Sequence, residues 1–239
     1  MFLLTRFSMP LTHKKKFIVI GLFLLIFNVS SFAHGVDSNT EHFLTTTHGS
    51  AFMPFLYIGA KHMVTGYDHL LFLIGVIFFL FRGRDILIYV SLFTLGHSLT
   101  LLLGVFNHIN MNVYLIDAVI AFSIVYKGFD NLGGFKRLLG TQPNTKIAVF
   151  FFGLFHGFGL ATKLQDFSLP QENLITNMLA FNIGVEIGQC LALLFILTLL
   201  GFWRRYNSYY TFSTASNTLL MSGGFVLLAF QITGYITSV

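Results

Sequence analysis

Charged residues are scarce in this chain. Lys, Arg, Asp and Glu make up only 10% of its 239 residues, whereas 55% are hydrophobic. A soluble globular domain carries about 25% charged residues. Here long apolar runs recur between short polar segments, a pattern that indicates several membrane-spanning helices. Most of the Lys and Arg residues lie outside those runs, so the net charge of +5 gives no indication of nucleic-acid binding.

Cysteine is nearly absent as well. The single one, Cys190, lies within an apolar run. One cysteine excludes an internal disulfide and any zinc or iron–sulfur site built on several thiolates. The sequence also lacks the H-E-x-x-H motif of zinc peptidases and the G-x-S-x-G motif of serine hydrolases. These absences leave histidine and carboxylate side chains as the groups that could bind a metal.

The first 33 residues resemble a secretory signal peptide. A basic segment at residues 13–16 precedes an apolar run at 17–29, and small residues follow up to Ala33. Because this apolar run is short for a membrane span, we expect cleavage after Ala33. Residues 34–50 would then form a periplasmic leader with three histidines. This leader is either a solvated segment or a weak metal-capture segment.

Six further apolar runs predict an all-α integral membrane protein. We expect its six transmembrane helices to form one domain over residues 51–239, with no soluble domain and no tandem repeat. The helices are predicted at residues 53–81, 86–106, 113–129, 146–164, 174–202 and 216–237.

Basic residues alternate along the segments that connect these runs. Those after the first, third and fifth runs hold Arg82, Arg84, Lys127, Lys136, Arg137, Lys146, Arg204 and Arg205. The segment after the second run has no Lys or Arg, and the segment after the fourth has only Lys163. By the positive-inside rule, both ends of the mature chain lie outside the membrane. The signal peptide implies the same orientation, so we expect a multi-pass protein of the bacterial inner membrane.

Ionisable and polar side chains interrupt the apolar runs. An ionisable group in the bilayer core costs several kcal/mol unless it is paired or hydrated, so each one needs a reason. At about 1.5 Å per residue from the charged loop ends, most of them fall at similar depths in the outer half of the membrane. The interrupting residues are His62, Asp68, His69, His97, Ser98, Asp117, His156, Asn182, Glu186 and Gln189.

The spacing of two histidines in the first run leaves two arrangements open. His62 and His69 lie seven residues apart, so they share one helix face but are separated by about 10.5 Å along the axis. A straight helix cannot easily aim both at one ion. Either Gly66 breaks the helix, or His62 belongs to an outer entry site and Asp68 or His69 to an inner one. Of the two, we favour the path with separate entry and inner sites.

Glycines flank two of the ionisable residues. One GxxxG pattern begins at Gly153 and surrounds His156, and another begins at Gly184 and surrounds Glu186. Because such glycines let helices approach closely, we expect the fourth and fifth runs to pack together. The fifth run also carries a polar stripe, at Asn182, Glu186 and Gln189.

Imidazoles and carboxylates without cysteine suit a borderline divalent ion such as nickel, cobalt, zinc or copper. They also suit a proton relay or a structural network. The candidate metal ligands are His62, Asp68, His69, His97, His156 and Glu186, with Asp117, Asn182, Gln189 and Ser98 in support.

Four motifs gather the polar residues of the apolar runs. They are H-x5-D-H at residues 62–69, F-T-L-G-H-S-L-T at 93–100, F-H-G-F-G at 155–159 and F-N-I-G-V-E-I-G-Q at 181–189. Together these motifs resemble the HupE/UreJ family of hydrogenase- and urease-accessory membrane proteins. The resemblance covers roughly residues 50–235. It implies a secondary permease that moves nickel or a similar metal without ATP, with metal residues at His62, Asp68, His69 and His156. Nickel-associated members continue the third motif with a second His-Gly, which this chain lacks, so it resembles a divergent branch.

Two other functions stay open at this stage. In an intramembrane hydrolase, three histidines and Asp68 would hold zinc, and Glu186 would act as the base. In a metal sensor or scaffold for metalloenzyme maturation, residues 128–145 would dock the partner proteins. In the permease, by contrast, the partners are the lipid bilayer and the metal ion, and no residue is catalytic.

Overall fold

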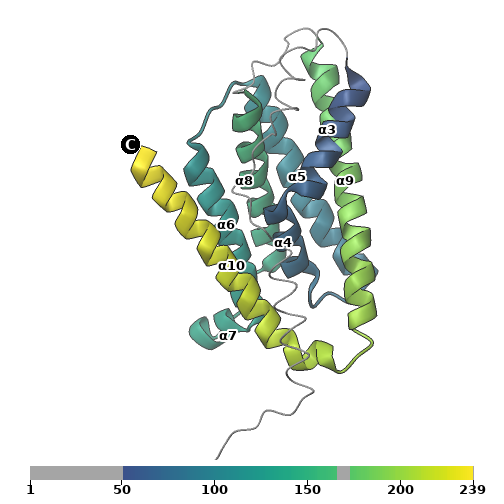
Figure 1. The fold of residues 1–239 in the computed structure, drawn as a ribbon, viewed down its shortest axis with the longest axis vertical. Helices are drawn as coiled ribbons and strands as arrows, with labels where there is room; N and C mark the ends of the chain where they lie inside the picture. Colours follow the sequence, from purple (N-terminus) through teal and green to yellow (C-terminus); the bar gives the residue numbers. More distant parts are fainter. Residues whose placement is uncertain (1–50, 166–172, 239) are drawn as a thin grey trace, which may run out of the picture. The chain divides into compact units, whose positions relative to one another are not determined.

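The computed structural model describes residues 51–165 and 173–238, and all regular structure in these two stretches is helical (Figure 1). The predicted signal peptide and the leader at 34–50 lie outside the described residues. The helices are α3 (Phe52–Thr65), α4 (Tyr67–Ile77), α5 (Gly83–Phe106), α6 (Val113–Asn131), α7 (Gly134–Leu139), α8 (Thr145–Gln165), α9 (Leu174–Trp203) and α10 (Ser208–Ser238).

Every predicted apolar run coincides with helical structure. Four helices, α5, α8, α9 and α10, are long and apolar enough to cross a membrane. The first run is divided between α3 and the short apolar helix α4, and the third corresponds to α6. The chain is therefore a multi-pass membrane protein whose described part is all-helical, as the sequence predicts.

The first run breaks at Gly66. This residue has an extended backbone, with φ −69° and ψ 96°, between the end of α3 and the start of α4. Its N–H still donates to the His62 carbonyl at 2.9 Å, and its own carbonyl accepts from Leu70 at 3.1 Å. A Cβ here would lie 3.0 Å from both the His62 oxygen and Nδ1 of His69, so glycine allows this close approach. The structure has the broken helix, and His62 lies beside His69 with ring centroids 5.2 Å apart, so the straight helix that favoured separate outer and inner sites is wrong.

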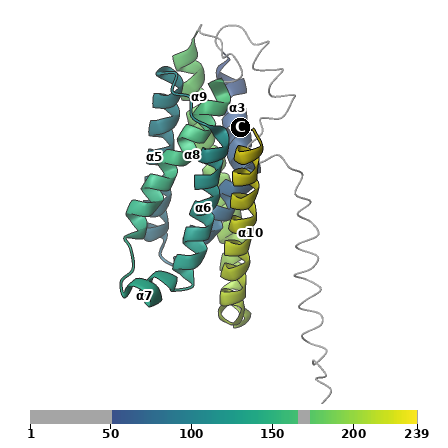
Figure 2. The ribbon, with the colours of Figure 1, turned by 90° about the vertical axis from the view of Figure 1, so that its left-hand side faces the viewer.

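The helices pack most extensively in three pairs: α3 with α9, α5 with α8, and α6 with α10 (Figures 1 and 2). Gly153 of α8 lies against the Phe93 carbonyl of α5, and Gly184 of α9 lies against the Leu56 carbonyl of α3. The prediction that the fourth and fifth runs pack together through their GxxxG patterns is therefore wrong. A glycine pattern signals a close approach but does not specify the partner helix.

The contacts of the first two pairs repeat one another. Gly59 of α3 lies against the Phe181 carbonyl of α9, just as Gly153 of α8 lies against the Phe93 carbonyl of α5. These contacts match α3 with α8 and α9 with α5. One helical turn away, the same match holds, because the paired residues are separated by the same number of positions along the chain. There Gly184 lies against Leu56 and the nitrogen of Ala60, and Gly96 lies against Phe150 and the nitrogen of Leu154.

In the third pair, α6 and α10 correspond to each other, because they contact one another through matching positions. Gly128 of α6 lies against Met221 of α10, and Gly224 of α10 lies against Val125 of α6. The order α3–α4, α5, α6 thus corresponds to the order α8, α9, α10. Equivalent helices run in opposite directions (Figure 1), so the described helices form two inverted three-helix repeats. The two halves share residues at few positions besides these contacts, so the correspondence lies in the packing of the helices and not in a recognisable sequence repeat.

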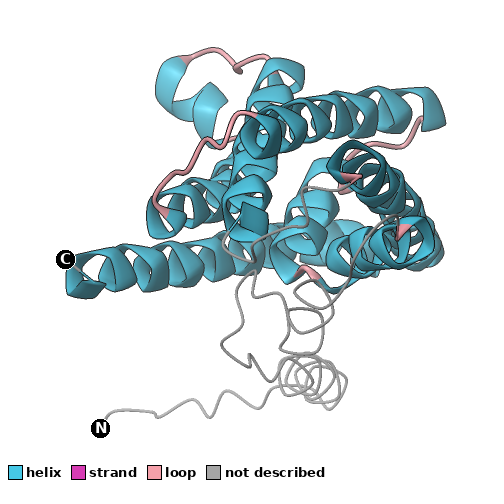
Figure 3. Ribbon diagram, turned by 90° about the horizontal axis from the view of Figure 1, so that it is seen from above, coloured by secondary structure: helices cyan, strands magenta, loops and turns pink. Residues whose placement is uncertain are grey.

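Several basic residues of the described chain gather at one end of the helices. The α4–α5 loop, α7 and the α9–α10 loop lie at one end of the helices (Figure 1), and α10 extends sideways from the others (Figures 1 and 3). Those segments carry Arg82, Lys136, Arg137, Arg204 and Arg205, and Arg84 lies beside them in the first turn of α5.

Two lysines that the sequence analysis counted with the loops are buried within helices instead. Lys127 of α6 pairs with Asp130 at 2.6 Å, and Lys163 of α8 pairs with Asp117 at 2.8 Å. Neither one is an orientation signal. The remaining basic residues still favour the same orientation.

Candidate functional site

Four histidines from four helices meet around His69, in the first turn of α4. The ring centroid of His69 lies 4.7 Å from that of His156, 5.2 Å from that of His62 and 5.9 Å from that of His97. His69, His97 and His156 are each at most 1% exposed, and His62 is partly exposed. The break at Gly66 makes this cluster possible, because it turns His69 toward the ring of His62.

A carboxylate orients the central imidazole. Oδ1 of Asp68 lies 3.0 Å from Nδ1 of His69 and accepts the backbone N–H of the same residue at 2.8 Å. A carboxylate only accepts hydrogen bonds, so Nδ1 carries the proton and Nε2 keeps its lone pair. Carboxylates hold metal-binding histidines in this way in many proteins. The sequence predicts Asp68 as a metal ligand, whereas this geometry supports orientation of His69 over direct ligation.

Several buried imidazole nitrogens have no hydrogen-bond partner among the described residues. They are both nitrogens of His97 and Nδ1 of His156. Nε2 of His156 lies 3.5 Å from the hydroxyl of Ser123, which donates to the Ile120 carbonyl at 2.6 Å. A buried polar atom without a partner costs about 1–3 kcal/mol, so a group of such atoms around one point marks a place that a ligand would stabilise.

The rings are gathered but not arranged for coordination. Within residues 51–165 and 173–238, no three His, Cys, Asp or Glu side chains are placed to hold one metal ion. The imidazoles contact one another at steep angles, with interplanar angles of 69° to 78° about His69. Ligation at about 2.1 Å would require the side chains to rotate toward a common point.

Two phenylalanines enclose the cluster. The ring of Phe93 lies 5.0 Å from that of His156 and 6.1 Å from that of His97, and the ring of Phe72 lies 5.6 Å from that of His156. Both are nearly fully buried, so they exclude water from the imidazoles. Nothing in the sequence distinguishes these two from the other phenylalanines, of which the chain has 30 in all, although each lies within or next to one of the histidine motifs.

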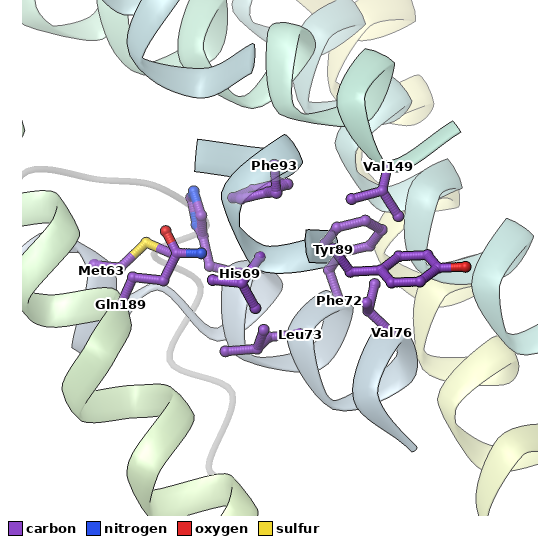
Figure 4. Close-up of a pocket in the computed structure, with 10 residues that line it drawn as sticks. Met63, His69, Phe72, Leu73, Val76, Tyr89, Phe93, Val149 and Gln189 are labelled. Carbon is purple, nitrogen blue, oxygen red and sulfur yellow. The ribbon is translucent and has the colours of Figure 1, made fainter. Parts of the chain in front are cut away.

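A narrow pocket leads away from His69. Figure 4 shows Met63, His69 and Gln189 at one end of the pocket, and Tyr89 and Val149 at the other. Oε1 of Gln189 accepts a hydrogen bond from the Thr94 hydroxyl at 2.7 Å, which ties α9 to α5. Tyr89 lies in the second turn of α5, so the pocket runs from the histidines toward the end that holds the basic residues.

Other residues proposed from the sequence lie elsewhere. Asp117 forms an ion pair with Lys163 at 2.8 Å. The Ser98 hydroxyl is buried without a partner in the described part of the chain, and Asn182 is half-buried. Glu186 is exposed.

The polar stripe predicted on the fifth run is therefore split. Gln189 faces the pocket, whereas Glu186 lies on the opposite side of α9 from the glycines that pack against α3. Residues 186 and 189 are about 60° apart around a helix. The edge of the packed face falls between them.

The two repeats place some of these polar residues at equivalent positions. At the offsets set by the glycine contacts, His62 is equivalent to His156, and Ser98 is equivalent to Glu186. The two equivalent histidines both contact His69, so the cluster lies where the two repeats meet.

Comparison with known proteins gives one match. A profile of the family described as HupE / UreJ protein matches residues 38–239. No curated protein and no solved structure matches the chain. The match covers most of the sequence and includes all four histidines of the cluster. The chain therefore belongs to the HupE/UreJ family.

Proposed function

We propose that this protein is a secondary permease for a divalent transition metal, with nickel as the first candidate. HupE/UreJ is a transporter family associated with nickel uptake for hydrogenase and urease. The cargo would bind among His62, His69, His97 and His156, with Asp68 orienting His69. Neutral imidazoles suit nickel, cobalt, zinc and copper, and the family association favours nickel among these.

The observation that carries the proposal is the position of the histidines between two inverted repeats. Transporters of this architecture bind cargo near the middle of the membrane at the repeat interface, and broken helices often form the site. Both features are present here: His69 follows a helix break, and two equivalent histidines contact it from the two repeats. Rocking of one repeat against the other would then open the cluster to each side in turn.

The proposal includes six spans with both mature ends outside the inner membrane. In addition to the four long apolar helices, α3 and α4 together would form one span and α6 another. Asp117, Lys127 and Asp130 of α6 all lie in buried ion pairs, which lowers the cost of placing them in the membrane. The basic end of the helices would face the cytoplasm.

Protons offer a means of driving release. Imidazoles bind a metal ion only when they are deprotonated, so each proton taken up by the cluster competes with the cargo. The site would thus exchange the metal for protons if it opens to a compartment of lower pH. Proton coupling is part of the proposal because protons and the metal compete for the same imidazole nitrogens.

Nickel accumulation in cells tests the proposal. Cells that lack other nickel importers would express the wild type, His69→Ala or His97→Ala, and cellular nickel would be measured by elemental analysis. We expect both variants to fall to the level of cells without the protein, at unchanged protein abundance.

The matched control is His108→Asn, because His108 is an exposed loop histidine with a positive φ of 51° that Asn tolerates. It should transport like the wild type. Wild-type accumulation by His69→Ala or His97→Ala would overturn the proposal.

The hydrolase alternative receives no comparable support. It needs a general base beside the histidines, and Glu186, the residue assigned to that role, lies on the exposed side of α9. The scaffold alternative would use α7 and its flanking loop, but it leaves the buried cluster without a role.

A further inference from the structure

Glu186 occupies an unusual place for a carboxylate. It lies 12 residues after the start of α9, or about 18 Å along an apolar helix of 30 residues, so it falls within the hydrocarbon layer. Its neighbours on the exposed side are Leu179, Ile183, Ile187, Leu191 and Leu194, which are 42% to 65% exposed. In a single copy of the chain this carboxyl group would face lipid.

The other carboxylates deep in the described helices have partners. Asp68 holds His69, and Asp117 holds Lys163. No hydrogen bond or ion pair reaches Glu186 from any residue in the described ranges. Because an ionisable group facing lipid is costly, its exposure indicates that another molecule covers this face.

The face itself has a defined polar composition. Asn182, Glu186 and Cys190 follow one another at four-residue spacing, so they form a line along α9. Oδ1 of Asn182 is buried and has no partner in the described part of the chain, and Cys190 is exposed. The line thus offers an amide and a carboxyl group one helical turn apart.

We propose that this face of α9 is the interface of a homodimer. A two-fold axis along the membrane normal would set the α9 helices of the two copies side by side in parallel. The carboxyl of Glu186 in each copy would then lie beside the Asn182 amide and the Glu186 carboxyl of the other copy. The flanking isoleucines and leucines would pack around these groups and keep lipid away.

A second copy suits the face better than a different membrane protein. Each copy supplies both a hydrogen-bond donor, the amide, and an acceptor, the carboxyl group, so the face is complementary to itself. A heterologous partner would need its own buried cation or donor at matching depth. By contrast, α10 is also largely exposed but contains no Asp, Glu, Lys or Arg, so lipid alone can cover it.

The inference depends on insertion in the membrane and not on transport. A failed uptake experiment and a failed dimer experiment can therefore be told apart.

The only cysteine of the chain provides a direct test. Purified wild-type protein in liposomes would be oxidised with copper phenanthroline and separated by gel electrophoresis without reductant. A disulfide forms only when two Cα atoms come within about 7 Å. We expect Cys190 to yield a product of twice the monomer mass that reductant reverses.

The matched control moves the thiol to the other exposed helix. Cys190→Ser combined with Ser222→Cys places one cysteine on α10, at a similar distance from the basic end. This variant should yield little of the doubled product. Equal yields from Cys190 and from residue 222 would overturn the proposal, as would a wild type that forms no product.

Substitutions at Glu186 test the polar contact. Single-molecule photobleaching in liposomes would measure the dimer fraction at several protein-to-lipid ratios. We expect Glu186→Leu to raise the dimer dissociation constant about 10-fold, because a polar contact between membrane helices is lost. Glu186→Gln, which keeps the hydrogen bonds, should stay within about 3-fold of the wild type.

Opposite results would contradict the proposal. A monomeric wild type at every protein density would overturn it. So would a dimer that Glu186→Leu leaves unchanged, because the carboxyl group would then play no part in the contact. In native membranes, a Cys190 adduct with a different protein and no doubled product would replace the homodimer with a heterologous complex.

Discussion

The two repeats pack their helices in the same way but carry different ionisable residues. Glycines in equivalent positions bring α3 to α9 and α8 to α5 in the same way. Yet the first repeat contains the helix break, Asp68 and three of the four clustered histidines, whereas the second contributes only His156. The second repeat instead carries Glu186, facing away from the cluster. Packing in this protein is thus nearly symmetric, and the candidate cargo site is not.

The sharpest test of this comparison concerns the glycines. Gly59→Leu and Gly153→Leu should each abolish folded protein, because the added side chain meets a carbonyl of the partner helix. Overpacking costs about 1–3 kcal/mol even where side chains can adjust, and a helix backbone cannot yield as they do. The measurement is the yield of monodisperse protein in size-exclusion chromatography.

Gly201→Leu and Gly223→Leu are the controls, since a side chain at either position meets nothing within 4 Å. They should give wild-type yields. Loss of folded protein in only one of the two equivalent variants would contradict the symmetry of the helix packing.

A smaller effect is expected at the ion pair that joins the repeats. Asp117 of the first repeat and Lys163 of the second lie 2.8 Å apart and are both buried. Asp117→Leu alone leaves a buried ammonium group and should lower the free energy of unfolding by about 3–5 kcal/mol. Adding Lys163→Met should recover most of this loss in thermal unfolding. A double variant no more stable than the single one would show that the pair is not coupled.

The equivalent histidines should differ in their importance for cargo binding. His156 is fully buried, and its Nδ1 has no partner among the described residues, whereas His62 is partly exposed. We expect His156→Ala to weaken nickel binding about 100-fold and His62→Ala about 10-fold, as measured by calorimetry on purified protein. Equal losses of nickel affinity, in variants of equal thermal stability, would mean that the site is as symmetric as the helix packing.

The smallest expected effect concerns the carboxylate that orients His69. Asp68→Asn can still accept a hydrogen bond from the imidazole but loses its charge. We expect the nickel concentration for half-maximal uptake to rise about 10-fold at an unchanged maximal rate. Asp85→Asn, near the basic end in the first turn of α5, should behave as the wild type. An unaltered half-maximal concentration in Asp68→Asn would remove Asp68 from the site.

Local composition predicts the helices and a common level for three histidines along them. Long apolar runs must form helices in lipid, because no water is present to satisfy an unpaired backbone. Counting along those helices placed His69, His97 and His156 near one level, and the structure brings their rings together. Both results depend on local composition and on the fixed rise of a helix, which are readable in a single chain.

Which helix faces meet depends on the packing of the whole bundle. The glycines of α8 and α9 predicted close packing but not its partners, which are α5 and α3. The edge of the packed face separates Gln189 from Glu186, and it brings Lys163 to Asp117 across the two repeats. These outcomes depend on how helices distant in the sequence pack side by side. A helix carries its own period and depth in its residues, but its neighbours are set by the packing of the whole bundle.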